Sequence, residues 1–208
     1  MSIFAEKLCS QHAIQLPTDL QQQLMRAQNT DLNSQQTWFR FMNDIEIEEI
    51  FNILSEIEVY DGILPLWADD QSNYVGIHYK GPFAYRVCHI SHEETDLSPG
   101  FRNVTSFLSA IEEAPDAEWE ELVREYPSHS PISGEELEQD LQSIASVQQW
   151  LTQDSIDEDM RCQRIFGLMA LTPSTHMEFI RSFVDDEDMY VQERAQELIK
   201  FHRATKRM

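Results

Sequence analysis

Basic residues are scarce in this chain of 208 residues, which has 15 lysines and arginines against 37 aspartates and glutamates. The formal net charge of -22 disfavours direct binding to nucleic acid or to anionic membranes, because both carry negative charge themselves. The same charge attracts basic proteins. We therefore expect a basic protein partner, and neither a nucleic acid nor a membrane.

Cysteine is scarce as well. Cys9, Cys88 and Cys162 lie far apart in the sequence and form no CxxC pair. An odd number of cysteines at this spacing is neither a disulfide framework nor a zinc-binding pattern. We interpret them as reduced, buried or unused thiols.

Long apolar runs are absent: none approaches the roughly 20 residues that a membrane helix needs. The N-terminal stretch also lacks the basic start and apolar run of a signal peptide, so we expect a cytoplasmic protein. Proline and glycine are sparse, at 8 and 6 residues, which argues against a long low-complexity linker. A hydrophobic content of 41% suffices for a packed core.

Sequence motifs of common enzyme classes are missing. GxxxxGK[ST], GxGxxG and GxSxG, which mark phosphate-binding loops, dinucleotide-binding turns and nucleophile elbows, do not occur. We expect a protein that is not an enzyme and that needs no cofactor. An enzyme with dispersed catalytic residues remains the alternative, because a Ser-His-Asp triad assembles from distant positions.

The segment HISHEE at 89–94 contains His89, His92 and Glu93, three potential metal ligands. The residues before it predict a strand, in which His89 and position 92 point to opposite faces. HxxHE also differs from the HExxH and HxxEH zinc signatures. We expect a half-buried strand histidine beside a polar turn, and no metal site.

Asp69 and Asp70, in the segment WADDQSNY, are candidates for calcium ligands. An EF-hand loop starting at Asp69 needs glycine at its sixth position and glutamate at its twelfth. This chain has Tyr74 and Lys80 at those positions. The pattern favours a turn whose Asp and Asn side chains hydrogen-bond the local backbone.

Periodic apolar spacing predicts helices, and runs of β-branched and aromatic residues between turn formers predict strands. The first half of the chain accordingly predicts helices over 3–13, from Pro17, over 44–57 and over 103–112, with strands over 37–42, 63–70, 73–79 and 85–91. The inward face of the 44–57 helix is expected to carry Ile47, Ile50, Phe51, Leu54 and Ile57.

The second half of the chain predicts helices throughout. Trp119, Leu122 and Val123 recur at helical spacing between Pro115 and Pro127, and the following helices are expected over 137–151, 156–171, 174–184 and 189–204. The fold class is therefore α+β: a curved antiparallel sheet backed by helices, followed by an all-helical C-terminal part. We place the domains at 1–127 and 134–208.

The acidity is concentrated in one band of the sequence. Between Glu112 and Asp159 there are 15 acids and one base, which leaves 14 net negative charges. Residues 1–111 hold 15 acids and 6 bases, and residues 160–208 hold 7 acids and 8 bases. The band is therefore the strongest candidate for contact with a basic partner.

The order of motifs from about residue 14 to 112 resembles the SUKH superfamily, the Smi/Knr type of domain. The segments that carry the resemblance are LPTDLQQQL, WFRFMNDIEIEEI, LPLWADDQSNY, GPFAYRVCHISHEE and SFLSAIEE. Where that family has Asn-Gly after its first helix, this chain has Asn29-Thr30. The resemblance implies a curved sheet backed by helices and a protein-binding role, in bacteria mostly immunity against a toxin.

Residues 160–204 are similar to one and a half HEAT-type repeats. An acidic loop, DDED at 185–188, lies between two helices and precedes V-x-x-R-A-x-x-L at 191–198. The family places arginine directly after the valine, where this chain has Gln192. Because fewer than three repeats rarely stand alone, we expect these helices to pack on other parts of the chain.

These observations lead to the hypothesis of an immunity protein whose acidic side chains occlude the basic nucleic-acid cleft of a cognate toxin. The candidate partner-binding residues are Trp67, Asp69, Asp70, Glu93 and Glu94 at the sheet turns, with Asp116, Glu118, Glu120 and Glu121 in the band. The alternative is a scaffold or regulatory protein with one partner on each part. The oligomeric state is left open.

Overall fold

The computed structural model describes residues 10, 12–29, 37–69, 71–128, 132–153 and 155–205. Three features discussed above lie wholly or almost wholly outside these described residues: Cys9, Asp70 and the helix predicted over 3–13.

The chain divides into two compact units. Unit 1 comprises Met1–Thr95 and Phe101–Val123, and unit 2 comprises Asp96–Gly100 and Arg124–Met208. Unit 1 combines helices with a sheet, whereas the regular elements of unit 2 are almost all helices. The expected fold class, an antiparallel α+β fold with a helical C-terminal part, is thereby confirmed. The domain bounds proposed from the sequence stay a prediction.

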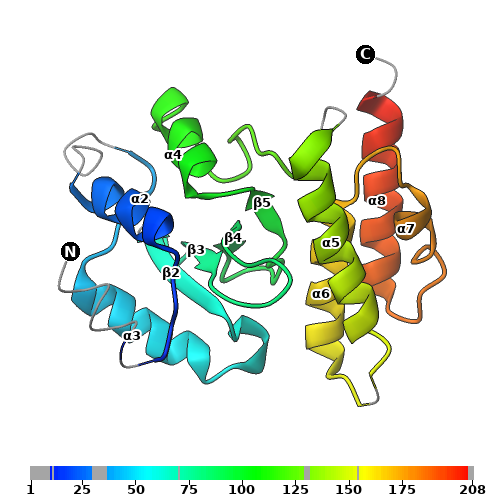
Figure 1. Ribbon diagram of the computed structural model, residues 1–208, viewed down its shortest axis with the longest axis horizontal. Coiled ribbons are helices and arrows are strands. Elements are labelled where there is room, and N and C mark those ends of the chain that lie inside the picture. Colours follow the sequence, from blue (N-terminus) through cyan, green and yellow to red (C-terminus); the bar gives the residue numbers. More distant parts are fainter. Residues whose placement is uncertain are drawn as a thin grey trace. The chain divides into compact units, whose positions relative to one another are not determined.

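Unit 1 contains most of the predicted elements (Figure 1). Its helices are α2 (Thr18–Asn29), α3 (Asp44–Ser55), the 3-10 helix η2 (Glu58–Tyr60) and α4 (Val104–Glu113). The strands are β1 (Arg40–Phe41), β2 (Ile63–Ala68), β3 (Tyr74–His78), β4 (Val87–Ile90) and β5 (Pro99–Phe101). β5 was not predicted, since three residues are too few to show a periodic pattern, and it contains the point where the chain passes between the units.

The sheet is a meander with the strand order β1-β2-β3-β4-β5. The first four strands pair antiparallel with their neighbours, and the register of β2 against β3 shifts between Pro65 and Trp67. This irregularity follows from the chemistry of proline, which has no N–H to donate to the ladder.

The strand β2 is buried at all six of its positions, which indicates that both faces of the sheet are covered. Figure 1 shows α3 on one side of the sheet and α4 on the other. Aromatic rings fill the α4 side: Trp67 packs edge to face against Phe41 and Phe107, at centroid distances of 5.2 and 5.0 Å.

The start of α3 is fixed by a capping box. The side chain of Asn43 accepts hydrogen bonds from the backbone N–H groups of Ile45 and Glu46, and the carboxylate of Glu46 accepts one from the N–H of Asn43. Three of the predicted inward residues are buried, but Ile57 is 49% exposed. That part of the prediction was wrong because α3 ends at Ser55, so Ile57 is off the helical face.

The helix predicted between Pro115 and Pro127 does not form. The chain instead makes turns and bends in which Trp119 and Leu122 are buried and Val123 is 81% exposed. Two causes account for the difference. Acidic side chains at helical spacing with few bases repel one another, and Trp119 gains more by packing on the core of unit 1 than a short helix could provide.

Unit 2 is built on α5 (Gly134–Trp150), α6 (Glu158–Leu171), α7 (Glu178–Arg181) and α8 (Met189–Thr205). α6 packs on α5 and α8, and α7 packs on α8. α7 is far shorter than the helix predicted over 174–184, because Ser174 and Thr175, which favour turns over helix, lie in a turn. None of the helices in the described ranges has the length and apolar composition that a membrane crossing requires.

Candidate protein-binding surface

Four strands of unit 1 begin or end together at one end of the sheet. Arg40 lies opposite Ala68, Ala68 opposite Tyr74, and Tyr74 opposite Ile90. These residues are the first of β1, the last of β2, the first of β3 and the last of β4. We call this end of the sheet, together with residues 69, 71–73 and 91–94 near it, the turn end.

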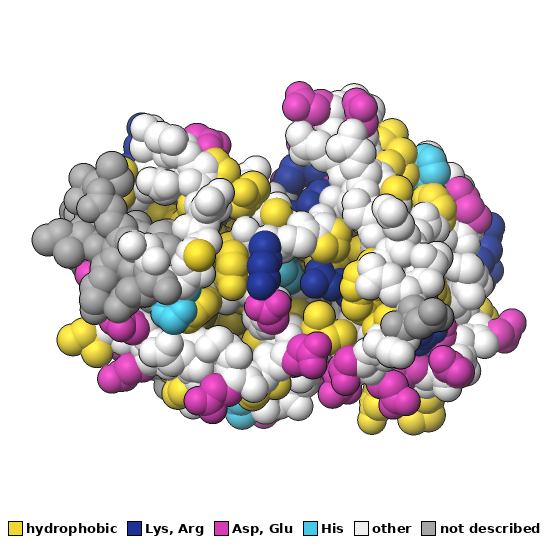
Figure 2. Space-filling model, turned by 60° about the horizontal axis from the view of Figure 1, so that its bottom comes forward, with side chains coloured by type: hydrophobic (Ala, Val, Ile, Leu, Met, Phe, Trp, Pro, Cys, Tyr) yellow, Lys and Arg dark blue, Asp and Glu magenta, His cyan; other side chains and the backbone are white. Residues whose placement is uncertain are grey.

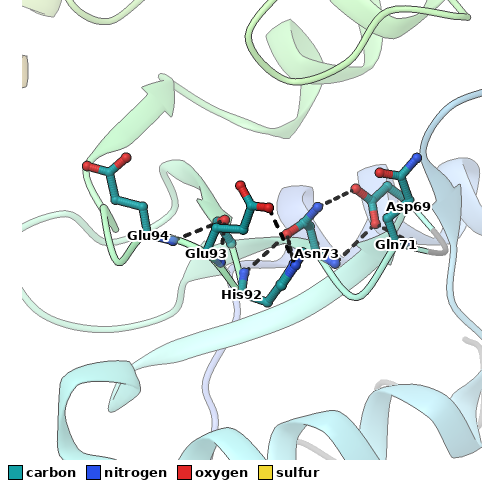
Figure 3. A network of polar contacts seen from close by, with 7 residues as sticks. Asp69, Gln71, Asn73, His92, Glu93 and Glu94 are labelled. Atoms are coloured by element: carbon teal, nitrogen blue, oxygen red, sulfur yellow. Dashed lines mark hydrogen bonds and ion pairs between the residues drawn. The ribbon is translucent and has the colours of Figure 1, made fainter.

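Asp69 organises the turn between β2 and β3 (Figure 3). Its Oδ1 accepts hydrogen bonds from the backbone N–H groups of Gln71 and Asn73 at 2.8 and 3.1 Å, and its Oδ2 accepts one from the side-chain amide of Asn73 at 2.7 Å. The predicted Asp-Asn turn is confirmed. The Asp69 carboxylate is engaged inside the turn, so it shapes the surface more than it offers a free charge.

The second turn is linked to the first through Asn73. Asn73 Oδ1 accepts a hydrogen bond from the backbone N–H of His92 at 3.1 Å and lies 2.8 Å from Nδ1 of the same residue. Ser91 Oγ accepts from the N–H groups of Glu93 and Glu94 at 3.1 and 3.4 Å. Both glutamates are exposed on this fixed backbone, and Figure 3 shows Glu94 directed away from the network.

The two histidines of the HISHEE segment have different surroundings. The His89 ring is half-buried and stacks on Trp119 at 5.0 Å with an interplanar angle of 11°. His92 faces Asn73, and its Nε2 lies 3.9 Å from a carboxylate oxygen of Glu93. Across the part of the chain that the structure describes, no group of three or more His, Cys, Asp or Glu side chains could hold a metal ion.

Residues 112–121, which we call the acidic segment, comprise the last two residues of α4 and the turns that follow it. The segment carries Glu112, Glu113, Asp116, Glu118, Glu120 and Glu121. Two contacts hold it at the turn end of the sheet. The N–H of Trp38, two residues before β1, donates to the carbonyl of Pro115 at 2.7 Å, and Trp119 stacks on His89, the residue before Ile90. Trp119 also meets the rings of Phe101 and Phe107.

All six carboxylates of the acidic segment are exposed. None of them forms an ion pair with another residue of the described ranges. Within the described ranges, the only polar contact of these six carboxylates is that of Glu121, which accepts a hydrogen bond from the N–H of Glu118 at 3.2 Å. The segment therefore presents concentrated negative charge that the described residues of unit 1 do not neutralise.

Glu112 and Glu113 stand in the last turn of α4, which contains no basic residue. The C-terminal end of a helix carries partial negative charge, so each acid there costs about 0.3–1 kcal/mol at low ionic strength. Neither residue was among the predicted contact residues. The count of acids against bases around Pro115 was the signal that could have identified them.

Trp67 requires a correction as a candidate contact residue. It was expected near the surface beside the Asp pair, but its side chain is 2% exposed and points into the core of unit 1. The reason is strand alternation: Ala68 and Trp67 point to opposite faces, and Trp67 faces α4. Asp70 lies outside the described residues.

The predicted acidic band does not lie within a single unit. The acidic segment belongs to unit 1, and the acids from Glu125 to Asp159 belong to unit 2. Asp140 is fully buried and accepts a hydrogen bond from the Tyr126 hydroxyl at 2.7 Å. On the face shown in Figure 2, acidic side chains are spread over the surface, and several of them gather at the lower right. The acidic segment carries its six exposed acids within ten residues of unit 1.

Ion pairs neutralise several acids of unit 2. Arg161 donates two hydrogen bonds to Asp186, at 2.9 and 2.6 Å, and Arg194 pairs with Asp96 at 2.7 Å. The Arg161 guanidinium holds the pKa of the Asp186 carboxyl below its usual range.

Burial, followed by neighbouring carboxylates, raises the pKa of the Cys162 thiol to about 12, so this cysteine is a poor nucleophile.

Comparison with protein-family models, curated proteins and solved structures finds no match to this chain. The SUKH-like and HEAT-like resemblances of the sequence therefore stay predictions.

Proposed function

We propose that the protein binds a basic protein toxin through the acidic segment and neutralises it by covering the toxin's nucleic-acid-binding cleft. The observation that supports this proposal most directly is a set of six exposed carboxylates, free of ion pairs with other described residues, on a segment whose backbone is anchored to the core.

Anchoring matters for affinity. A disordered acidic tail loses conformational freedom when it binds, whereas a segment already fixed by Trp119 and the Trp38–Pro115 hydrogen bond loses less. The lack of ion pairs leaves the negative charge available, because none of the described arginines has to be displaced before a partner's lysine or arginine can approach. Complementary charge of this kind accelerates association and excludes wrong partners.

Glu93 and Glu94 extend the same negative surface. They are exposed at the turn end of the sheet, where the acidic segment is also held. Asp69 contributes by fixing the turn through which Asn73 holds His92. Trp67 contributes only to the core. In this proposal the partner faces carboxylates on a rigid sheet end, spaced along a backbone as phosphates are along a nucleic acid.

The toxin as partner is suggested by the SUKH-like order of motifs between residues 14 and 112 together with the charge. In this proposal the protein acts without catalysis and in the cytoplasm, where a nuclease toxin would reach nucleic acid. Its mechanism is occlusion.

The experiment is a growth-protection assay with the toxin candidates encoded beside this protein's gene. Each candidate is expressed from an inducible promoter with the wild-type protein, or with a segment-neutral variant. That variant replaces the six carboxylates of the acidic segment by amides (E112Q, E113Q, D116N, E118Q, E120Q and E121Q). The wild-type protein is expected to restore growth, and the segment-neutral variant is expected to fail while remaining folded by circular dichroism.

A matched control distinguishes the effect of where the removed negative charges lie from the effect of the change in net charge. Six exposed acids of unit 2 are neutralised instead (E138Q, E158Q, D159N, E178Q, E187Q and E193Q), which changes the net charge equally. This unit 2 control variant is expected to protect as the wild type does. Absence of protection by the wild type against every adjacent candidate, or equal protection by the segment-neutral variant, contradicts the proposal.

A further inference from the structure

A hollow of about 220 Å³ opens on the α3 side of the turn end. Its walls combine apolar and acidic side chains, with Met42, Ile50 and Ala68 beside Glu46, Glu49 and Tyr74. Liquid water occupies about 30 Å³ per molecule, so the hollow is large enough for a long side chain. The acidic segment does not line it.

The charges around the hollow do not cancel. Arg40 also lines it, but its guanidinium is held by Glu46 in a two-pronged pair at 2.9 and 2.7 Å. This pair lowers the pKa of the Glu46 carboxyl. Glu49 is exposed and has no ion-pair partner among the described residues. One negative charge is therefore left over inside the rim of the hollow.

Tyr74, which also lines the hollow, lies close to negative charge as well. Burial, followed by the carboxylates of Asp69 and Glu46, raises the pKa of its hydroxyl. A neutral tyrosine hydroxyl offers an acceptor oxygen to a cation, and the Tyr74 ring offers a face. The hollow thus has two groups that favour a cation and no basic group that is not already paired within the residues lining it.

Exposed apolar side chains of α3 flank Glu49, which lines the hollow. Ile45 and Ile53 are 69% and 59% exposed, and they stand four residues before and after Glu49. Residues at this spacing share one face of a helix, so the carboxylate of Glu49 lies between two exposed isoleucines. Exposed apolar side chains bordered by polar ones are typical of a protein-binding surface.

We propose that the hollow binds a lysine side chain of the partner, with the ammonium group at Glu49 and Tyr74 and the methylene stem against Met42, Ile50 and Ala68. Lysine fits better than arginine because its compact ammonium does not need a carboxylate that can accept two parallel hydrogen bonds. The carboxylate of Glu46, which could accept two, already does so from Arg40. The inference deepens the proposed function and rests on it, since it supplies one specific contact for a basic partner.

The test is an NMR titration of the full chain, labelled with nitrogen-15. The probe is Nα-acetyl-lysine N-methylamide, in which the side-chain ammonium group is free. The uncharged norleucine analogue and acetyl-arginine methylamide serve as comparison probes. The lysine probe is expected to shift the amide signals of Glu49, Ile50, Ser72 and Tyr74 more than those of the acidic segment. The norleucine probe is expected to leave them unchanged, and the arginine probe is expected to bind more weakly.

Two variants make the test specific. Glu49→Gln is expected to weaken the lysine probe about threefold, as the loss of one exposed charge pair implies, and Tyr74→Phe to weaken it less. Glu56→Gln, an exposed acid at the end of α3 that does not line the hollow, is the matched control and is expected to have no effect.

Shifts spread evenly over all acidic surfaces, stronger binding of the arginine probe, or unchanged binding by Glu49→Gln overturn the proposal. Its failure is distinguishable from failure of the proposed function. If growth protection persists while the titration fails, the partner uses the acidic segment without the hollow. If the titration succeeds and no toxin candidate is neutralised, the hollow stands and the toxin is not the partner.

Discussion

The acidic segment of unit 1 and the DDED loop at 185–188 of unit 2 have similar composition but different contacts. In the loop, Asp186 is held by Arg161, and Asp188 accepts a hydrogen bond from the N–H of Tyr190 at the start of α8. In the acidic segment, the carboxylates face solvent and make no ion pair with another described residue.

This difference separates acids that hold a fold together from acids that are free to contact something else. Acids near a helix N-terminus or opposite arginine stabilise the protein. Acids in the last turn of α4 oppose its dipole, so their presence there is not explained by stability. Sites that conflict with local stability are where function is expected. The predictions below test whether the two regions differ in this way.

The largest expected effect comes from breaking the ion pair in unit 2. In Arg161→Met, the Asp186 side chain, which is 7% exposed, loses its counter-charge, and the free energy of unfolding is expected to fall by about 3 kcal/mol. Urea denaturation followed by circular dichroism measures it. Glu187→Gln, an exposed neighbour in the same loop, is the control and should change stability by less than about 0.5 kcal/mol. Equal effects of the two variants would show that the loop acids are not structural.

The same pair predicts a dependence of stability on pH. Because the folded-state pKa of Asp186 is depressed, its contribution is complete above the unfolded pKa of about 3.9 and is lost as pH falls through the folded pKa. Wild-type stability in urea should therefore decrease more steeply below about pH 4 than that of Asp186→Asn. Parallel pH profiles of the two proteins would show that the pair does not set this dependence.

A smaller effect is expected from Tyr126→Phe. The Tyr126 hydroxyl donates to the fully buried carboxylate of Asp140 at 2.7 Å, and loss of a hydrogen bond to a buried charged group costs about 1.5–3 kcal/mol. Tyr85→Phe, which removes the hydroxyl of an exposed tyrosine, should leave the denaturation midpoint unchanged. An unaltered midpoint in Tyr126→Phe would mean that Asp140 needs no support from the tyrosine.

The smallest expected effect is a gain in stability. Glu112→Gln combined with Glu113→Gln should stabilise the protein by about 1 kcal/mol at low salt, because both charges oppose the dipole of α4. The gain should shrink at 1 M NaCl as charges are screened. Glu158→Gln, in the first turn of α6, is the matched control with the opposite sign. A loss of stability in the double variant would indicate that these two glutamates have a structural role.

Local patterns made much of unit 1 predictable. The helix α3 and the strands β2, β3 and β4 follow from apolar spacing, and the Asp69 turn follows from the affinity of Asp and Asn side chains for nearby backbone. The region after α4 was not predictable in this way. The spacing of Trp119 and Leu122 matches a helix, but the partner of Trp119 is His89, thirty residues earlier in the sequence, and local periodicity carries no information on such a contact.

The candidate site was predictable in its charge and not in its geometry. Glu93, Glu94 and the acids around Trp119 were found from composition and turn patterns, and they are exposed. Trp67 was misplaced because the choice of face in a strand depends on what covers each face. The hollow beside Tyr74 is lined in part by the Arg40–Glu46 pair, which joins β1 to α3 and has no signature in the sequence.

The most direct test of the central claim is the rate constant for association of the protein with the toxin candidate that it neutralises, measured by stopped flow at low and high salt. The segment-neutral variant is expected to associate about tenfold more slowly than wild type at low salt. The two rates should converge at high salt, and the unit 2 control variant should match the wild type. Equal rates for wild type and the segment-neutral variant at low salt would contradict the claim that the acidic segment receives the partner.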